Sequence, residues 1–498
     1  MRFEMNPSRA LLSVSQMSEA DRFTIQSGVP AAALMENAGR AVTQEVIRRW
    51  DKRPTVVLCG PGNNGGDGFV VARLLREAGW PVRLALIGPV EKLLGEARFH
   101  ANLWQGGVEL LKPVVVNDAE LVVDAIFGAG LRRPLDGDVR DTLAEVAARK
   151  IDMLAIDLPT GIMGDSGASL GAIPAAVTVT FFRKKPGHLL LPGRDYCGDV
   201  VVADIGIPET VFSKIIPNTF ENSPTLWLEM LPLPIASDHK YKRGHALISG
   251  GYPMTGAARL SAIAAARTGA GLTTIAVPEV AFPIYAAALT SIMVHPLIDN
   301  DAFNTLLQDK RFTAFLIGPG AGVAEETTCR TLAMLKTGKA TVIDADAITA
   351  FQANPSELFQ AIQGTCVMTP HEGEFQRLFD ATSDKLSRSR MAATQSNAVI
   401  ILKGADTVIS EPGGCSVINT NAPATLATAG AGDVLSGILL GLLAQGMEPF
   451  FAALAAVWIH GEAANRFGLG LIAEDLPNQL PAVYQELAKQ KAARTKIL

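Results

Sequence analysis

Short apolar runs that end in glycine or polar residues recur along the chain. In the first part they occupy residues 55–59, 82–87, 121–126, 153–157 and 177–181. Their length and β-branched content predict buried strands. Segments with helical spacing of apolar residues separate most of them; one is residues 17–50, which Pro30 divides into two helices, and another is residues 69–78. This alternation predicts a Rossmann-like αβα domain with a parallel sheet.

A second α/β pattern begins at residue 244. Further strands are expected at 315–317, 341–343, 366–368 and 399–402, with an alanine-rich helix at 255–268 and an apolar helix at 434–443. Residues 208–240 carry five prolines and no sustained periodicity, which is typical of an interdomain linker. We therefore predict two α/β domains, residues 1–222 and 223–498.

Composition narrows the class of protein. The chain has 498 residues, too many for one ordinary domain, and its formal net charge of -5 gives no general attraction to nucleic acid or anionic lipid. Residues 1–12 contain Glu4 and lack an apolar region, which argues against a signal peptide, and no apolar segment reaches membrane-spanning length. The 5 cysteines have no paired spacing, so reduced thiols without a zinc site are expected. We expect a cytoplasmic homo-oligomer that acts on small molecules and has no nucleic-acid or membrane partner.

Residues 428–437 combine small residues with one carboxylate. Gly430 and Gly432 precede an apolar helix, and such a turn collects backbone N–H groups at the positive end of the helix dipole. An anion would bind there, and Asp433 could accept a proton from a substrate hydroxyl. The alternative is that the glycines only cap an ordinary helix.

Polar residues also follow three strands of the first domain. Open α/β sheets bind ligands at this edge. The residues are Asn63, Asn64 and Asp67 after the first strand, Asp124 and residues 128–134 at another, and Asp157 with residues 159–161 at a third.

Carboxylates at neighbouring strand ends repel unless a cation or a shared proton lies among them. A cation bound by oxygens of Asn64, Asp124 and Thr160 would satisfy this requirement. The alternative is that Asp124 and Asp157 only cap turns. The glycine-rich turn at 62–68 has the spacing of neither a dinucleotide fingerprint nor a P-loop, so it gives little support to conventional NAD redox chemistry.

The motifs at 62–68, 124–134, 157–161 and 185–187 resemble those of the NAD(P)H-hydrate epimerases. The resemblance spans roughly residues 14–208. It implies a potassium ion held by Asn64, Asp124 and Thr160, where Thr160 replaces the usual Ser and keeps the hydroxyl. It also implies that the hydrated nucleotide contacts Asn63, Asn64, Gly65, Gly66, Asp67, Gly128, Ala129, Gly130, Leu131, Arg132, Arg133, Pro134 and Asp157.

Strand ends in the second domain are polar or glycine-rich as well. Lys403 closes a strand beside a glycine, a suitable place for a cation facing nucleotide phosphate. His371 follows another strand, where either a capping or core role or a ligand contact is open.

The second domain resembles the ribokinase-like fold, and more narrowly the NAD(P)H-hydrate dehydratases. The segments that support this resemblance are 239–241, 256–257, 318–320, 369–374, 403–405 and 429–435, and the resemblance covers residues 237–487. Residues 423–426 replace a Pro-Gly-Met segment of many relatives, and Glu372 stands where relatives often have Pro. Neither departure touches the glycine turn or Asp433. Because both halves match, the epimerase-like half first and the dehydratase-like half second, the whole chain resembles the bifunctional NAD(P)H-hydrate repair enzymes.

The resemblance implies a division of labour. The first domain would interconvert the R and S forms of NAD(P)H hydrated at C6 (NADHX and NADPHX), with Asp124 and Asp157 as acid–base candidates. The second would dehydrate the S form using ADP, with Mg²⁺, giving AMP and phosphate; the sequence does not separate ADP from ATP. Asp433 is the expected catalytic base. Nucleotide contacts are expected at Lys403, Gly404, Ala405, Asp406, Thr407 and Gly432, and hydrate contacts at Ala257, Gly320, His371 and Asp433.

Two other functions remain open at this point. The second domain could be an ATP-dependent small-molecule kinase. The first could be a noncatalytic binding or scaffold module, although its intact Asp67, Asp124 and Asp157 argue against that.

Overall fold

The computed structural model describes residues 7–495; residues 1–6, which include Glu4, and 496–498 lie outside this description. The chain divides into two compact units. The first is Ala10–Thr219, and the second runs from Phe220 onward together with η1 (Pro7–Arg9). Each is an α/β unit with a largely parallel sheet, which confirms the predicted fold class.

The first unit is built on a parallel sheet. Its strand order within the described residues is β3-β2-β1-β4-β5-β6-β7. The order changes direction between β1 and β4, which opens a ligand-binding crevice at the carboxyl ends of these strands. The bounds are β1 (Thr55–Cys59), β2 (Val82–Leu86), β3 (Val108–Leu110), β4 (Leu121–Ala125), β5 (Asp152–Ile156), β6 (Val177–Phe181) and β7 (Asp199–Ala203). The five predicted strands are confirmed within about one residue, whereas the short edge strands β3 and β7 were missed.

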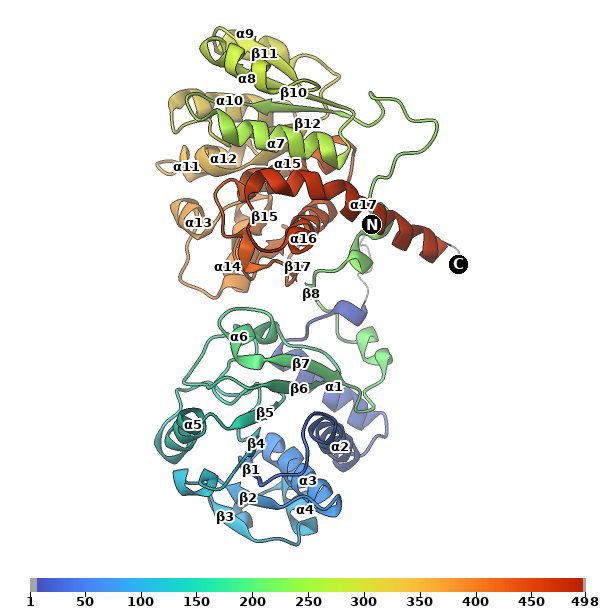
Figure 1. The fold of residues 1–498 in the computed structure, drawn as a ribbon, viewed down its shortest axis with the longest axis vertical. Helices are drawn as coiled ribbons and strands as arrows, with labels where there is room; N and C mark the ends of the chain where they lie inside the picture. Colours follow the sequence, from blue (N-terminus) through green and yellow to red (C-terminus); the bar gives the residue numbers. More distant parts are fainter. Residues whose placement is uncertain (1–6, 496–498) are drawn as a thin grey trace. The chain divides into compact units, whose positions relative to one another are not determined.

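Helices lie on both faces of this sheet. Figure 1 shows α5 on one side and α1 to α4 on the other. Pro30 does separate α1 from α2, as predicted. The bounds are α1 (Val14–Gln26), α2 (Ala31–Arg49), α3 (Asn63–Glu77), α4 (Gly95–Leu103), α5 (Gly137–Arg149) and α6 (Gly193–Cys197).

The prediction that residues 62–68 form a turn before a helix at 69 is wrong. Helix α3 already begins at Asn63, and the glycines form its first turns. A Cβ on Gly65 would lie 1.8 Å from the carbonyl oxygen of Gly60, and one on Gly68 would lie 2.6 Å from the Cβ of Ala125. These glycines therefore let the helix approach the sheet closely, rather than supply the freedom of a turn.

The second unit also has a doubly wound sheet. Its order within the described residues is β11-β10-β9-β12-β13-β14-β15-β16-β17-β8, with parallel pairing from β11 to β15 and antiparallel pairing from β15 to β17. The bounds are β8 (Thr219–Glu221), β9 (His245–Ser249), β10 (Leu272–Pro278), β11 (Met293–Leu297), β12 (Ala314–Ile317), β13 (Ala340–Ile343), β14 (Cys366–Met368), β15 (Val399–Leu402), β16 (Val408–Ser410) and β17 (Ser416–Ile418).

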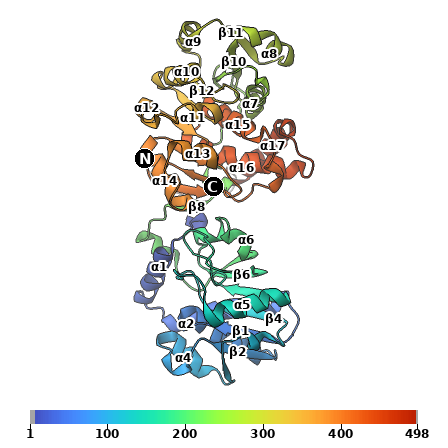
Figure 2. The ribbon, with the colours of Figure 1, turned by 90° about the vertical axis from the view of Figure 1, so that its left-hand side faces the viewer.

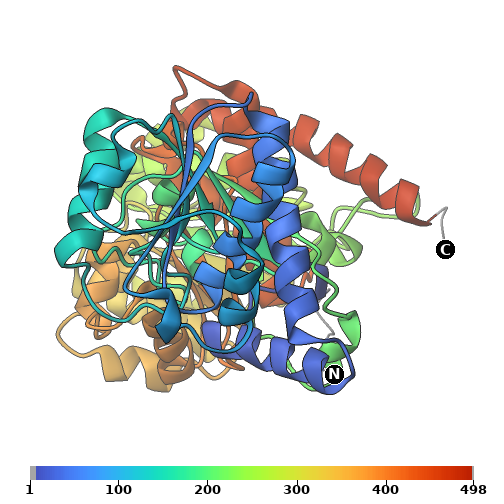
Figure 3. The same ribbon diagram turned by 90° about the horizontal axis from the view of Figure 1, so that it is seen from below.

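Two groups of helices cover this sheet. Figure 2 shows α10 to α13 on one side and α7, α15, α16 and α17 on the other, and Figure 3 shows α17 extending outward to the C-terminus. The bounds are α7 (Thr255–Thr268), α8 (Phe282–Ala288), α9 (Asn300–Leu307), α10 (Glu325–Lys336), α11 (Ala345–Thr349), α12 (Pro355–Ala361), α13 (Glu372–Leu378), α14 (Lys385–Ser396), α15 (Ala431–Ala444), α16 (Pro449–Phe467) and α17 (Leu476–Thr495). No helix among the described residues combines the length and apolarity needed to cross a membrane.

The predicted linker at 208–240 is only partly a linker. The two units divide between Thr219 and Phe220, and the chain then packs into the second unit at once. Trp227 is fully buried, and its Nε1 donates to Oδ1 of Asn222 at 3.2 Å. Prolines separate these short packed pieces and hide their apolar pattern, which explains the error.

Close packing of α15 against α7 positions the glycine turn in front of Asp433. A Cβ on Gly437 would lie 2.2 Å from the carbonyl oxygen of Ser261, so the two helix backbones are nearly in contact there. We expect Gly437→Ala to destabilise the second unit by about 1–3 kcal/mol, because the helices must move apart.

Gly256→Ala is the matched control for this prediction, since nothing lies within 4 Å of the added Cβ in α7. It should leave the thermal unfolding transition of the second unit unchanged or raise it slightly. Equal transition temperatures for the two variants, measured by calorimetry, would contradict the packing argument.

Candidate active sites

The first unit has a cavity of about 950 Å³ at the carboxyl ends of its strands. It gathers most of the residues predicted to bind the hydrated nucleotide: Asn63, Asn64, Asp67, Gly128, Ala129, Gly130, Leu131, Arg132, Arg133 and Asp157. Gly65, Gly66 and Pro134 are not among the residues that line it. Gly65 packs on the backbone of Gly60, and a Cβ on Gly66 would lie 2.5 Å from Sδ of Met35, so both serve packing.

Asp157 is the cavity acid with the strongest partner. It follows β5 in a left-handed conformation with φ of 66°. Its Oδ1 accepts from Nζ of Lys185 at 2.5 Å and from Oγ1 of Thr180 at 3.1 Å, and its Oδ2 accepts from the amide of Ala129 at 3.0 Å. Burial acts to raise the pKa of Asp157, but Lys185 and these hydrogen bonds outweigh it and hold the pKa at about 2. Asp157 is therefore ionised throughout the physiological range.

Two other acids of the cavity have raised pKa values. Burial lifts the pKa of Asp67 well above its usual range, and the charges of Asp157 and Asp21 add to this effect. Burial likewise raises the pKa of Asp21 in α1 to about 6, with Lys185 opposing and Asp157 reinforcing the shift. Among the described residues, none donates a hydrogen bond to either carboxylate. Because a buried acid without a hydrogen-bond donor favours its neutral form, Asp67 is a candidate proton donor in this cavity.

Sequence reasoning assigned no role to Asp21 or Lys185. Asp21 lies in an amphipathic helix, where an acid is usually a solvated surface residue. Lys185 belongs to a motif used for the resemblance, but it is separated from Asp157 by 28 positions. Only the parallel pairing of β5 with β6 brings the two together.

Asp124 lies beneath the cavity, not in its wall. Its side chain is fully buried, and its carboxylate accepts from the amide of Thr160 at 2.8 Å, from Oγ1 of Thr160 at 2.7 Å and from the amide of Ile126 at 3.2 Å. Burial raises its pKa to about 6, partly offset by the hydrogen bonds from Thr160. Asn64, in the first turn of α3, has a buried Nδ2 that makes no hydrogen bond. Asp124 thus carries buried negative charge with no side-chain cation bonded to it.

Asp433 occupies the first turn of α15 in the second unit. Gly430 caps this helix with φ of 86°, and the first N–H groups of a helix have no partner within it. The Asp433 side chain is partly buried, and no described residue donates a hydrogen bond to its carboxylate. Burial raises its pKa to about 7, with the charge of Asp344 reinforcing the shift and that of Lys403 opposing it.

Lys403 is the cation of this site. Its Nζ donates to Oδ1 of Asp344 at 2.9 Å and lies 3.8 Å from Oε2 of Glu374. Burial acts to lower the pKa of Lys403, but Asp344 and Glu374 outweigh it, so the pKa is raised. A Cβ on Gly432 would lie 3.5 Å from Nζ. The ammonium group therefore lies directly beside the glycine turn.

His371 is the N-cap of α13. Its Nδ1 accepts from the amides of Gly373 and Glu374 at 3.0 and 3.3 Å, which supports the capping interpretation, yet its side chain is 57% exposed. Its Nε2 lies 3.3 Å from Oε1 of Glu374, so both ring nitrogens already have neighbours and the exposed face of the ring is what it presents to a ligand. Gly320 has φ of 66°, and a Cβ there would lie 2.3 Å from the carbonyl oxygen of Met254, so no other residue fits well.

The predicted nucleotide loop after β15 is shaped by its own side chains. The carboxylate of Asp406 accepts from Nζ of Lys385 at 2.5 Å, and Oγ1 of Thr407 donates to the carbonyl of Gly404 at 2.7 Å. Asp406 and Thr407 are buried, whereas Gly404 and Ala405 are exposed. A nucleotide would meet the backbone of this loop more than its side chains. Ala257 is half-buried in the first turn of α7.

Comparison with known proteins matches both units. The family model described as NAD(P)H-hydrate dehydratase matches residues 245–483, and the one described as YjeF-related protein N-terminus matches residues 31–187. A crystal structure of the ADP/ATP-dependent NAD(P)H-hydrate dehydratase from Bacillus subtilis, co-crystallised with ATP/Mg²⁺, is 28% identical with a TM-score of 0.48, covering 53% of this chain and 97% of that one.

Two curated relatives align over nearly the full length, and both are named bifunctional NAD(P)H-hydrate repair enzyme Nnr. The protein from Moorella thermoacetica is 36% identical, over 96% of this chain and 97% of its own length. The one from Salinibacter ruber is 36% identical, over 96% of this chain and 96% of its own length. The chain belongs to the family of bifunctional NAD(P)H-hydrate repair enzymes.

Proposed function

We propose that this chain repairs hydrated nicotinamide coenzymes in two steps. The first unit interconverts the R and S epimers of NAD(P)HX, and the second dehydrates the S epimer at the expense of ADP, giving NAD(P)H, AMP and phosphate. The observation that carries the second step is the arrangement at α15, where the carboxylate of Asp433 accepts no hydrogen bond from the described residues and stands beside Lys403.

The C6 hydroxyl of the hydrate is a poor leaving group, so the site must first convert it into a better one. In our proposal Asp433 removes the proton of the hydroxyl while its oxygen attacks the terminal phosphorus of ADP, and the bond to AMP breaks. The N–H groups of the turn at 430–432 and the ammonium of Lys403 stabilise the charge on the transferred group. Phosphate then leaves C6 with the electron pair of its bond, driven by the ring nitrogen, and loss of a C5 proton completes the reduced ring.

Among the described residues no group of three or more acids, histidines or cysteines could hold a metal ion by itself, so a divalent cation here would need the nucleotide phosphates as further ligands. Asp344, Asp346 and Glu374 all raise the pKa of Asp433, and Lys403 alone opposes them among the groups that act on it. Mg²⁺ is usually held by one or two carboxylates together with substrate phosphates. Mg²⁺ bound to the nucleotide would neutralise phosphate charge here, with Asp346 or Glu374 as its protein ligand.

In the first unit we assign different duties to the two predicted acids. Asp157 lines the cavity and so faces the hydrate, whereas Asp124 is buried behind it. The carboxylate of Asp124, the hydroxyl of Thr160 and the side-chain carbonyl oxygen of Asn64 offer oxygen ligands of the kind that hard cations take. We therefore propose that Asp124 is an ion ligand and not an acid–base group. K⁺ would supply a fixed positive charge that orders the loops around the cavity.

The remaining proposals concern the localisation, oligomeric state and partners of the enzyme. We propose a cytoplasmic homo-oligomer that binds NADHX, NADPHX and ADP and takes neither nucleic acid nor membrane as a partner. The formal net charge of -5 supports the absence of a general attraction to polyanions.

Asp433→Asn tests the role of the carboxylate in dehydration. We expect the ADP-dependent rate to fall by roughly 10²–10⁴-fold, because a general base is lost, while epimerisation in the first unit is unchanged. Since the base must be ionised, the rate of the unmodified chain should rise as pH increases through about 7. The measurement is formation of reduced nicotinamide from S-NADHX against pH. A variant that keeps both the rate and the pH rise would remove Asp433 from this role.

Asp124→Asn tests the potassium site. Potassium chloride, compared with choline chloride, should raise both the epimerisation rate and the unfolding temperature of the first unit in the unmodified chain. The variant should lose both responses, because the charge that holds the ion is gone. Asp51→Asn, on the exposed surface of the same unit, is the control and should keep them. Equal potassium responses in Asp124→Asn would rule out the site.

A further inference from the structure

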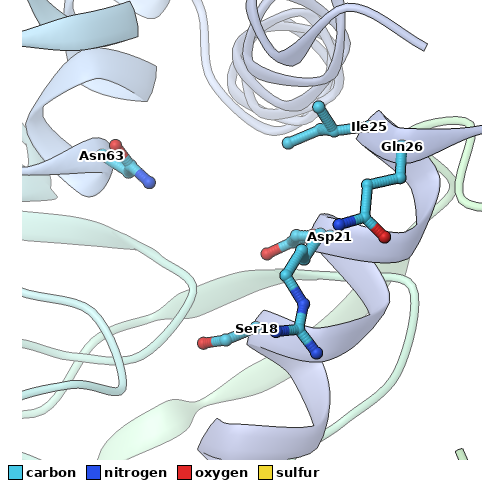
Figure 4. A pocket seen from close by; sticks show the side chains of 6 residues that line it. Ser18, Asp21, Ile25, Gln26 and Asn63 are labelled. Carbon is cyan, nitrogen blue, oxygen red and sulfur yellow. The ribbon is translucent and has the colours of Figure 1, made fainter. Parts of the chain in front are cut away.

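Helix α1 contributes an acid to the first cavity from outside the segment that the family model matches. That model begins at residue 31, whereas Asp21 lies in α1. Asp21 lines the 950 Å³ cavity, and it also lines an adjoining hollow of about 440 Å³. Figure 4 shows Ser18 and Asp21 on the face of α1 that is turned toward Asn63 at the start of α3. Asp21 therefore contributes a carboxylate to the wall that lies between the two spaces.

Charged groups from several elements face Asp21. Lys185 and Asp157, from the carboxyl ends of β6 and β5, act on it electrostatically, and Asp21 in turn acts on Asp67 of α3. Arg22 borders the smaller hollow. The other charged residues that line the large cavity are Glu96, Arg132 and Arg133. Lys185 already forms its ion pair with Asp157, so it compensates Asp21 only in part.

Of the four aspartates in or beneath the cavity, Asp21 is the one best able to accept a proton. Asp157 is held by Lys185, Thr180 and Ala129, which makes it a weak base with little freedom to move. Asp124 is fully buried and does not line the cavity. Burial raises the pKa of Asp67 well above its usual range, which suits it to give a proton rather than to take one. Asp21 is only partly buried and accepts no hydrogen bond from the described residues.

We propose that Asp21 is a catalytic residue of the epimerase unit, which takes the proton of the C6 hydroxyl while Asp67 gives a proton to the ring nitrogen. This proposal rests on the proposed epimerase function. The pair lies on two helices that border one cavity, α1 and α3. That placement lets an acid and a base act on different atoms of the same ring.

The reaction is a balanced ring opening and closure. The O–H electron pair becomes the second bond of a carbonyl at C6, the C6–N1 bond breaks, and its electron pair takes the proton of Asp67. Rotation about C5–C6 turns the other face of the carbonyl toward N1. The steps then reverse, so both acids return to their starting states and no oxidant or reductant is needed. This route keeps the C6–O bond, which suits a site that has acids but no phosphoryl donor.

The test uses the full chain without ADP, so that the second unit consumes none of the product. Purified R-NADHX is incubated with enzyme, and R and S forms are separated by chromatography. We expect Asp21→Asn to lower kcat at least about a hundredfold with little change in KM. The rise of kcat/KM with pH, centred at about 6 in the unmodified chain, should disappear in the variant. Asp21→Glu should restore at least a tenth of the lost rate.

Glu19→Gln on the same helix is the matched control, because Glu19 is exposed and does not line either space. It should keep the normal rate and pH profile. ADP-dependent dehydration of S-NADHX and the unfolding temperature of the first unit report whether Asp21→Asn is folded. A folded Asp21→Asn variant with normal kcat overturns the proposal, as does an inactive variant whose loss Asp21→Glu does not relieve. An unmodified chain that does not epimerise R-NADHX would overturn the proposed function and this proposal with it.

Discussion

Both sites depend on the same kind of interaction, in which one buried or half-buried lysine forms an ion pair with one of several nearby acids. Lys185 forms an ion pair with Asp157 in the first unit, and Lys403 forms one with Asp344 in the second. The charges within each ion pair neutralise one another. The neighbouring acids are poorly solvated, so their neutral form is favoured. Asp433, whose pKa is raised to about 7, is the clearest result. The same arrangement thus keeps one carboxylate ionised and makes another able to exchange a proton near neutral pH.

The parallel sheets explain why this arrangement arises twice. In a doubly wound sheet, the carboxyl ends of neighbouring strands meet at one edge, so residues far apart in sequence become neighbours. Asp157 follows β5 and Lys185 follows β6, while Asp344 follows β13 and Lys403 follows β15. Close packing of the helices then sets the depth of each site. Gly65 and Gly437 let a helix backbone approach the sheet or another helix to a distance that a side chain would prevent.

Much of this could be predicted from the sequence, because strands buried on both faces have a strong local signal. The bounds of β1 and β6 were predicted residue for residue, and Asp433 was placed at a helix start. How deeply each candidate site residue is buried could not be predicted in the same way. Whether Asp124 lies in the wall of the cavity or behind it depends on how β4 and the segment carrying Thr160 pack, which no local pattern reveals.

Errors had equally physical causes. Glycines in residues 62–68 suggested a turn, although they serve helix packing, and prolines in residues 208–240 hid the packing of Trp227. Asp21 was missed because an acid on an amphipathic helix carries no mark that distinguishes a cavity wall from a solvated surface. The strongest support for the function is that both units align, in the same order, with relatives over 96% of the chain.

The central claim is that one chain carries two cooperating sites, each with its own acids. The most direct measurement supplies the full chain with a mixture of R- and S-NADHX and with ADP, and follows reduced nicotinamide together with AMP. Our account predicts that both epimers are recovered completely, with one AMP formed for each coenzyme repaired. Recovery that stops when the S epimer is exhausted, or that proceeds without formation of AMP, would contradict it.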